Sequence, residues 1–246
     1  MELRYIEKNK GGQRRKWEMR LKAAHRTLGK QALAVLFIAT IATASGLTRA
    51  EAPQIGDKLP DFQLQDLAGK SHSLSKYAGK IVVLNFCSQE CPWSRGADAK
   101  INEVARAYGE KGVVFLGIDS HYTTPTEAIK AYAEKVGVPY PILKDSGNVY
   151  ADKVSAQRTP EIYIVDRQGQ LAYHGAFDNR TQPGQVGEVN YVVDALDALL
   201  AGREVAKPTA AAWGCTIKRA PKSESQQTSA GHKTCGPGCT KPCCTS

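Results

Sequence analysis

Apolar and polar residues follow one another along the middle of this chain in a pattern that predicts a mixed α/β fold. The strongest signal is an unbroken run of mostly apolar, often β-branched residues at 81–86, typical of a strand that is buried on both faces. A helical pattern follows, and its apolar positions are Ala97, Ile101, Val104, Ala105 and Tyr108. Comparable apolar runs predict further strands at 113–118 and 161–166.

Weaker patterns complete the order of elements. Alternation at 62–67 and a turn before 71–74 predict a β-hairpin, and Arg167–Gln170 predicts a turn into a strand at 171–175. A helix is expected from Pro125, with Ala128, Ala131, Tyr132 and Val136 on its buried stripe. A short strand at 141–145, a helical turn at 149–154 and a closing helix at 189–200 follow. The expected fold is a central mixed sheet flanked by helices, with an N-terminal β-hairpin extension.

The net charge of +9 belongs to the two ends of the chain. Residues 1–30 hold ten Lys and Arg against three Asp and Glu, residues 202–246 hold seven against two, and the middle holds sixteen against nineteen. A nucleic-acid-binding domain would place its positive charge on a folded face. We therefore expect no nucleic-acid partner.

The first 52 residues are typical of an export segment. Basic residues precede an apolar run at 32–41, and Ala42-Thr43-Ala44 and Ala50-Glu51-Ala52 are small-residue cleavage patterns. The segment is expected to be a signal peptide or, alternatively, a membrane anchor, which places the protein in the periplasm or outside the cell, where disulfides persist. Three parts are expected: the export segment (1–52), a folded domain (53–201) and a flexible, Cys-rich extension (202–246).

Cys91 is the first candidate for chemistry. It follows the strongest predicted strand and precedes Pro92, which suits the first position of a helix. A cysteine at such an N-cap faces the positive end of the helix dipole, which stabilises a thiolate and makes it a nucleophile near neutral pH. The alternative is an inert, buried structural cysteine.

The chain has six other cysteines. Cys87 forms Cys-x3-Cys-Pro with Cys91, and Cys215 lies past the last predicted helix. The tail cysteines, together with His232, resemble a soft-metal cluster but match no zinc spacing closely, so tail disulfides or reactive thiols are favoured and no metal or cofactor is assigned. The tail cysteines are Cys235, Cys239, Cys243 and Cys244.

A family resemblance rests on four segments: GDKLPDFQLQDLAGK, VVLNFCSQECPWS, RTPEIYIVDRQGQLAYHGAFDNR and WGCTIK. They resemble the thioredoxin fold, and within it the exported, peroxiredoxin-like redoxins of the alkyl hydroperoxide reductase/thiol-specific antioxidant type. The resemblance covers about residues 54–218. It implies that Cys91 is the attacking cysteine, that Pro160 is a cis-proline beside it, and that Thr159 is the residue before that proline.

The departures from the family pattern also carry expectations. Ser94 stands where thioredoxins have their second cysteine, so Cys215 becomes the candidate resolving cysteine. Ser88 stands where peroxiredoxins have a Thr that binds peroxide. Pro160 stands where peroxiredoxins have an Arg that stabilises the thiolate, and Arg158 is the candidate replacement for that Arg. The peroxidase constellation is therefore incomplete.

These residues predict a thiol-dependent oxidoreductase that needs no cofactor. Cys91 attacks a peroxide or a disulfide, and Cys215, or Cys87 if the start of the helix frays, resolves the intermediate. A thiol protein or a small thiol restores the cysteines, and a slow peroxidase at best is expected. The alternative is a copper-binding chaperone that uses Cys87, Cys91 and the tail. The Cys-x3-Cys-Pro motif resembles the copper chaperones of cytochrome oxidase assembly, but Arg158 stands where those proteins have a distal His ligand. A redox-inert interaction domain whose tail thiols bond a partner is a third possibility.

Overall fold

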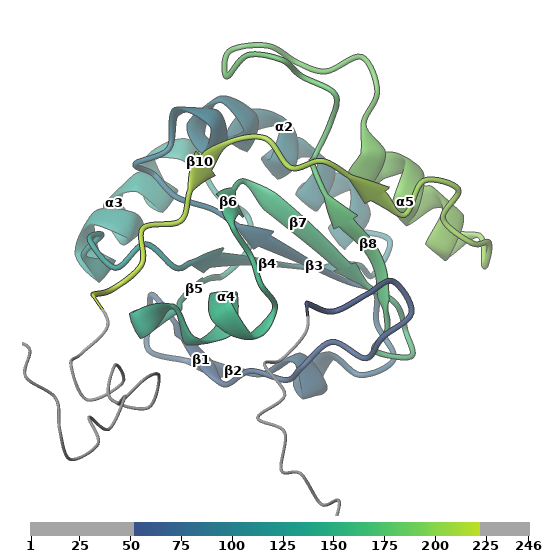
Figure 1. Cartoon of the computed structure of the whole chain (residues 1–246), viewed down its shortest axis with the longest axis horizontal. Coiled ribbons are helices and arrows are strands. Elements are labelled where there is room, and N and C mark those ends of the chain that lie inside the picture. The colour runs from purple at the N-terminus through teal and green to yellow at the C-terminus, as the bar shows by residue number, and fades with distance from the viewer. Residues whose placement is uncertain (1–51, 222–246) are drawn as a thin grey trace, which may run out of the picture. The chain divides into compact units, whose positions relative to one another are not determined.

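The computed structural model describes residues 52–221, and the predicted signal peptide and the tail cysteines lie outside that range. Eight strands form one mixed sheet in the order β2-β1-β5-β4-β3-β7-β8-β9, and a separate two-stranded ladder joins β10 to β6 (Figure 1). The strands are β1 (Leu64–Asp66), β2 (Ser71–His72), β3 (Val82–Phe86), β4 (Val114–Asp119), β5 (Ile142–Lys144), β6 (Arg158–Thr159), β7 (Glu161–Val165), β8 (Leu171–Gly175), β9 (Thr209–Ala210) and β10 (Cys215–Thr216). The helices are α2 (Pro92–Gly109), α3 (Thr126–Val136), α4 (Val149–Lys153) and α5 (Tyr191–Leu200), with 3-10 turns η1 (Leu74–Tyr77) and η2 (Ser146–Asn148).

The centre of the sheet is built as the apolar runs predict. Strand β3 is buried throughout, and it pairs in parallel with β4 and antiparallel with β7. The antiparallel β1–β2 pair comes first along the chain, the parallel strands β3, β4 and β5 follow, and the antiparallel β7–β8 hairpin comes after them. Because β3 is central, its carboxyl end delivers the chain to the middle of one sheet edge, where α2 begins.

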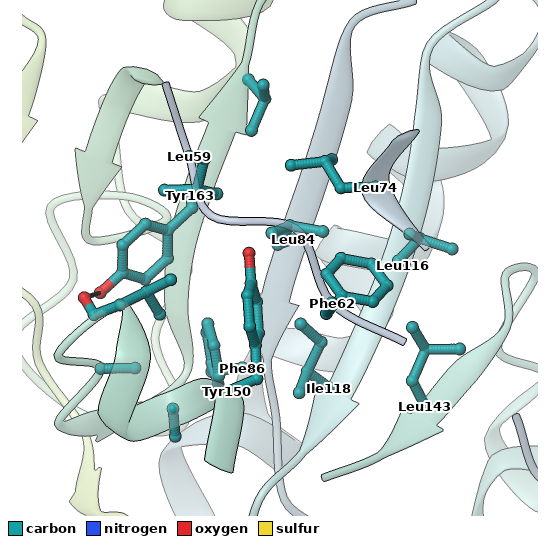
Figure 2. Packing of buried hydrophobic residues seen from close by; sticks show 14 of the residues in the cluster. Leu59, Phe62, Leu74, Leu84, Phe86, Leu116, Ile118, Leu143, Tyr150 and Tyr163 are labelled. Atoms are coloured by element: carbon teal, nitrogen blue, oxygen red, sulfur yellow. Dashed lines mark hydrogen bonds between the residues drawn. The ribbon is translucent and has the colours of Figure 1, made fainter. Parts of the chain in front are cut away.

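Two apolar layers cover the faces of this sheet. One face packs against α2 and α5, whose buried stripes include Ile101 and Leu196. On the other face, Phe86 lies between Tyr150 of α4 and Tyr163 of β7, with ring centroids 6.2 and 5.5 Å away (Figure 2). Each fully buried aromatic of this kind stabilises the fold by several kcal/mol, on the order of 3–5 relative to alanine. The mixed α/β fold with a central sheet is confirmed.

Two predicted helices need correction. In α3 the buried residue is Ile129, with Tyr132, Ala133 and Val136 half-buried, whereas Ala128 and Ala131 are exposed. The small side chains of the alanines fit either the buried or the exposed face of the helix, so they do not identify the buried face. The larger Ile129 determines which face packs against the sheet. Helix α5 begins at Tyr191, two residues later than predicted, because the Asn190 side chain accepts a hydrogen bond from the backbone N–H of Val193 and caps the helix.

The expected end of the folded domain at residue 201 differs from the structure. Strand β9 adds to the edge of the main sheet beside β8. After β9, the segment 211–221, here called the strap, crosses over β6 and ends on the α3 side of the molecule (Figure 1). Ile217 of the strap is 2% exposed and belongs to the core. The fold therefore continues to residue 221, despite the polar composition of this stretch.

Candidate active site

Cys91 caps the N-terminus of α2, as the sequence predicts. Pro92 occupies the first helical position, and the Cys91 sulfur accepts a hydrogen bond from the backbone N–H of Ser94 at 3.4 Å. The thiol donates to the backbone oxygen of Thr159 at 2.9 Å. Only 1% of the residue is exposed. The sulfur thus lies between a helix N-terminus, which favours negative charge, and the backbone of β6.

The Thr159–Pro160 peptide bond is cis, as the family resemblance implied. Thr159 belongs to β6, and its partner in the antiparallel ladder is Cys215 of the strap. A glycine is required beside this pair: Gly214 has φ +124°, and a Cβ there would lie 2.2 Å from the Thr159 oxygen. The close approach of the two backbones brings Cys215 opposite Cys91.

The two sulfurs share one electrostatic environment. Burial raises the pKa of Cys215 to about 11, and the neighbouring Cys91 sulfur adds to that rise. The backbone N–H of Trp93 acts in the opposite direction and lowers it. The rise in the pKa of Cys215 therefore disfavours a thiolate on that sulfur.

The strap is anchored on both sides of Cys215. Before Cys215, the ring of Trp213 packs against that of Trp93 in a tilted arrangement, with ring centroids 5.3 Å apart. The indole N–H of Trp213 donates to the backbone oxygen of Asp178 at 2.8 Å. The guanidinium of Arg180, in a fully buried ion pair with Asp178, lies 4.8 Å from the Trp213 ring centroid. These contacts hold the strap against the first turn of α2.

After Cys215, the buried Ile217 is followed by Lys218, whose ammonium binds the carboxylate of Glu90 at 2.5 Å. Glu90 immediately precedes Cys91 in the chain, and it also accepts a hydrogen bond from the Thr124 hydroxyl at 2.6 Å. The hydrogen bond from Lys218 and that from Thr124 lower the pKa of Glu90 to about 2. The Glu90–Lys218 pair thus ties the far end of the strap to the loop that carries Cys91.

The two residues expected to activate a peroxide have other partners. The Ser88 hydroxyl accepts from the backbone N–H of Glu90 at 3.1 Å, and so stabilises the turn before Cys91. The Arg158 guanidinium donates to the Gly214 oxygen at 3.1 Å, on the exposed side of the strap. Within residues 52–221, neither side chain makes a hydrogen bond to the Cys91 sulfur.

Cys87 lies apart from this pair. It directly follows β3, packs with Ile129 and Ile142, and is buried. Burial raises the pKa of Cys87 well above its ordinary value, and the carboxylates of Asp119 and Asp98 raise it further. Cys87 is thus a buried packing residue. Residues 52–221 hold no group of three His, Cys, Asp or Glu side chains suited to a metal ion. The copper alternative gains no support from this part of the chain.

Sequence reasoning missed Glu161, which follows the cis-proline. Its buried carboxylate accepts hydrogen bonds from the backbone N–H groups of Gln157 and Arg158 at 2.7 Å, and from His174 at 2.6 Å. Burial raises the pKa of Glu161, but the hydrogen bonds from His174 and the two amides outweigh it, so the pKa is lowered. Glu161 fixes the backbone of β6, and a carboxylate directly after Thr-Pro was the available signal.

A cysteine at a helix N-terminus, a cis-proline facing it and a mixed central sheet define a thioredoxin-fold, thiol-dependent redox protein. The model of the AhpC/TSA family matches residues 55–174. Thiol-disulfide oxidoreductase ResA of Geobacillus kaustophilus is 30% identical over 124 residues, which cover 50% of this chain and 70% of the relative. Peroxiredoxin Q of Triticum aestivum, a chloroplast protein, is 29% identical over 57% of this chain and 67% of its own length.

Solved structures agree with these relatives. An uncharacterized conserved protein from Geobacillus kaustophilus superimposes with a TM-score of 0.65 at 30% identity, over 69% of this chain and 94% of that chain. A hypothetical protein from Sinorhizobium meliloti 1021 gives the same TM-score at 27% identity, over 70% of this chain and 98% of that chain. The chain belongs to the AhpC/TSA family of thioredoxin-fold redoxins, and it is a thiol-dependent oxidoreductase of the thioredoxin and peroxiredoxin type.

Proposed function

We propose that the protein exchanges thiols for disulfides through the pair Cys91 and Cys215. The Cys91 thiolate attacks one sulfur of a substrate disulfide, a new S–S bond forms, and the other substrate sulfur leaves as a thiolate. Cys215 then attacks the Cys91 sulfur, which releases the second substrate thiolate and leaves a Cys91–Cys215 disulfide. An outside thiol reductant, protein or small molecule, returns both cysteines to thiols.

The observation that carries this proposal is the pairing of Cys215 with Thr159, directly opposite Cys91. Ser94 occupies the position at which thioredoxins have their second cysteine, and the strap supplies Cys215 instead. Part of the rise in the pKa of Cys215 comes from Cys91. Once Cys91 is in a mixed disulfide it carries no charge, so Cys215 ionises more easily at the step in which it is needed.

Disulfide substrates fit this site better than peroxides. A fast peroxidase needs fixed donors at both peroxide oxygens, and losing one such donor costs roughly 100-fold or more in rate. The hydroxyl of Ser88 accepts from the backbone N–H of Glu90, and the guanidinium of Arg158 donates to the backbone oxygen of Gly214, so neither bond fixes a donor at the Cys91 sulfur. The hydrogen bonds of the Cys91 sulfur within residues 52–221 are to the backbone oxygen of Thr159 and the backbone N–H of Ser94, so none of them brings a side-chain donor to the place of a peroxide oxygen.

We also propose an exported location for this activity. The basic and apolar pattern of residues 1–52 supports a signal peptide or a membrane tether, and the pair of cysteines suits an oxidising compartment. Within residues 52–221, no helix has the length and apolar character needed to cross a bilayer. Cell fractionation with N-terminal mass analysis tests this: mature protein that retains residues 1–41 in the cytoplasm would contradict export.

Stopped-flow kinetics test the chemistry. The reduced protein is mixed with a disulfide substrate and with hydrogen peroxide, and the variants Cys91→Ser, Cys215→Ser and Cys87→Ala are compared with wild type. We expect Cys91→Ser to abolish reaction, Cys215→Ser to stop after a mixed disulfide, and Cys87→Ala, the matched control, to react normally. Equal rates in wild type and Cys91→Ser would refute the proposal.

A further inference from the structure

Glu161 is a buried carboxylate that takes no direct part in the proposed exchange of thiols and disulfides. It is 3% exposed, and a buried charge is strongly unfavourable unless hydrogen bonds replace those it made to water. Its Oε2 accepts hydrogen bonds from the backbone N–H groups of Gln157 and Arg158, both at 2.7 Å. Its Oε1 accepts from the Tyr163 hydroxyl at 3.3 Å and lies 2.6 Å from Nε2 of His174. Two of the four partners are thus main-chain groups at and just before the start of β6.

His174 of β8 holds the Glu161 side chain in this orientation. A carboxylate can only accept hydrogen bonds, so Nε2 of His174 carries the proton in this contact. The imidazole stacks on the ring of Tyr163, its ladder partner on β7, with ring centroids 4.2 Å apart. Its side chain is 33% exposed, so substitutions at His174 disturb the core less than substitutions at Glu161.

The strand that Glu161 holds is too short to be rigid by itself. Strands β6 and β10 have two residues each, and their ladder is separate from the eight-stranded sheet. The Gln157 N–H donates to Glu161, and the Gln157 oxygen accepts from the Ile217 N–H of the strap at 3.0 Å. Gln157 therefore joins the buried carboxylate to the strap.

Both sulfurs of the pair take their positions from β6. The Thr159 oxygen accepts the Cys91 thiol at 2.9 Å, and Thr159 pairs with Cys215 in the ladder. In the closing step the Cys215 thiolate attacks the Cys91 sulfur, an S–S bond forms between them, and the substrate sulfur leaves as a thiolate. A misplacement of about 1 Å in such a step costs on the order of 100-fold in rate. A residue that fixes β6 therefore influences this step through the position of Cys215.

We propose that Glu161 and His174 form a positioning pair, which holds β6 so that the strap presents Cys215 to the Cys91 sulfur at a high effective concentration. This proposal rests on the proposed function, because it concerns the closing of the Cys91–Cys215 disulfide. It assigns the two residues an effect on the alignment of the sulfurs in addition to their contribution to stability.

Asp66 offers a matched control for this contact. Its Oδ1 accepts hydrogen bonds from the backbone N–H groups of Ala68 and Lys70, both at 2.9 Å, and its Oδ2 lies 2.8 Å from Nε2 of His72. Two main-chain amides and one imidazole therefore surround this carboxylate too. It belongs to β1, which is separated from β7 of Glu161 by three strands of the sheet. Asp66→Asn should lower stability and leave the cysteine pair unchanged.

The effective concentration of Cys215 is measured at equilibrium in the full chain. The protein is incubated with mixtures of reduced and oxidised glutathione, quenched by alkylation and mapped by mass spectrometry. The ratio of the Cys91–Cys215 disulfide to Cys91 bonded to glutathione with Cys215 free, multiplied by the concentration of reduced glutathione, gives the effective concentration. This ratio compares two states of one pair, so it does not depend on how far the other cysteines react. We expect Glu161→Gln to lower it about tenfold, the size of one hydrogen bond to a charged group, and Asp66→Asn to leave it within twofold of wild type.

Two substitutions at His174 test the hydrogen bond itself. His174→Phe keeps a ring for the stack on Tyr163 and removes the N–H donor, so it should lower the effective concentration about as much as Glu161→Gln. His174→Gln keeps a side-chain N–H donor and should stay within twofold of wild type. These variants carry the test even if Glu161→Gln does not fold. Equal values in His174→Phe and His174→Gln would overturn the positioning role of His174.

Amide hydrogen exchange of the reduced protein gives a reading that is independent of thiol chemistry. The Ile217 N–H, which donates to Gln157, should lose about tenfold in protection in Glu161→Gln and keep its protection in Asp66→Asn. Unchanged protection of Ile217 in a folded Glu161→Gln protein would overturn the route through β6. An equal loss in Asp66→Asn would attribute the effect to general loosening of the fold and would also overturn it.

Failure of the positioning pair is separable from failure of the proposed function. If wild type forms no Cys91–Cys215 disulfide at any glutathione ratio, the proposed function itself is wrong. If wild type forms the disulfide and Glu161→Gln forms it with the same effective concentration, only the positioning pair is wrong.

Discussion

The close approach at Gly214 offers the sharpest test of how Cys215 is positioned. In Gly214→Ala, the new Cβ would lie 2.2 Å from the Thr159 oxygen and 2.8 Å from its carbonyl carbon. An ordinary carbon–oxygen contact is about 3.4 Å, so the strap must move away from β6 by roughly 1 Å. The backbone at φ +124° adds strain on the order of 1–3 kcal/mol for any residue with a Cβ.

The assay is the rate at which the Cys91–Cys215 disulfide closes after a mixed disulfide has formed on Cys91. It is measured in a tail-serine variant, which carries Cys235→Ser, Cys239→Ser, Cys243→Ser and Cys244→Ser so that the tail cysteines cannot interfere. A misplacement of about 1 Å costs on the order of 100-fold in such a step, so we expect Gly214→Ala to close about 100 times more slowly. Attack by Cys91 on the substrate should change little, because Cys91 is held by α2 and β6.

Gly202→Ala is the matched control. Gly202 has φ +68°, so it carries a comparable backbone strain, but a Cβ there would meet nothing within 4 Å. It should lower stability and leave the closing rate unchanged. Closure at the wild-type rate in Gly214→Ala would refute the argument that the β6–β10 contact positions Cys215, and equal slowing in both variants would attribute the effect to strain alone.

Three other predictions concern the strap, the pair and the core. Glu90 has its pKa lowered from 4.5 to about 2, so its pairing with Lys218 stabilises the strap above about pH 4.5 and is lost as the pH falls through about 2. Since the pair is largely solvated, the protection factors of the strap amides, which correct for the pH dependence of intrinsic exchange, should fall by no more than about fivefold over that range. Glu90→Gln should remove this pH dependence, and an unchanged dependence in that variant would contradict it. Cys215, whose pKa is about 11, should be alkylated slowly at pH 8, and Cys91→Ala should return its pKa toward the ordinary value and speed alkylation; no acceleration would mean that the two sulfurs do not interact. Phe86→Ala should lower the free energy of unfolding by about 3–5 kcal/mol, against less than about 0.5 for the exposed Val149→Ala, with denaturant melts as the measurement; equal losses would place Phe86 outside the core.

The sequence predicted the parts of the site that are built locally. The apolar strand, the Cys-Pro pair and the first turn of α2 adjoin one another in the chain, so the N-cap position of Cys91 follows from spacing alone. The central strands were found for the same reason, since a run that is buried on both faces leaves a continuous apolar signal.

The rest of the site depends on contacts between distant segments. Strands β6 and β10 have two residues each, too few to show an alternation of apolar and polar positions. Their pairing joins Thr159 to Cys215, 56 residues further along the chain. The place of Cys215 was therefore an implication of family resemblance until the structure showed the ladder. The strap has the composition of a polar tail because a single buried side chain, Ile217, provides most of its apolar anchoring past Cys215. The position of Glu161 directly after Thr-Pro was a local signal, but the backbone N–H groups of Gln157 and Arg158 that donate to it are identified only by the fold.

The central claim is that Cys91 and Cys215 form the redox pair, and the most direct measurement is a peptide map of the tail-serine variant after one equivalent of oxidised glutathione. The account predicts a Cys91–Cys215 disulfide with Cys87 free, and a lasting glutathione adduct on Cys91 when Cys215→Ser is added. A Cys87–Cys91 disulfide, or a glutathione adduct that persists on Cys91 while Cys215 stays a free thiol, would contradict it.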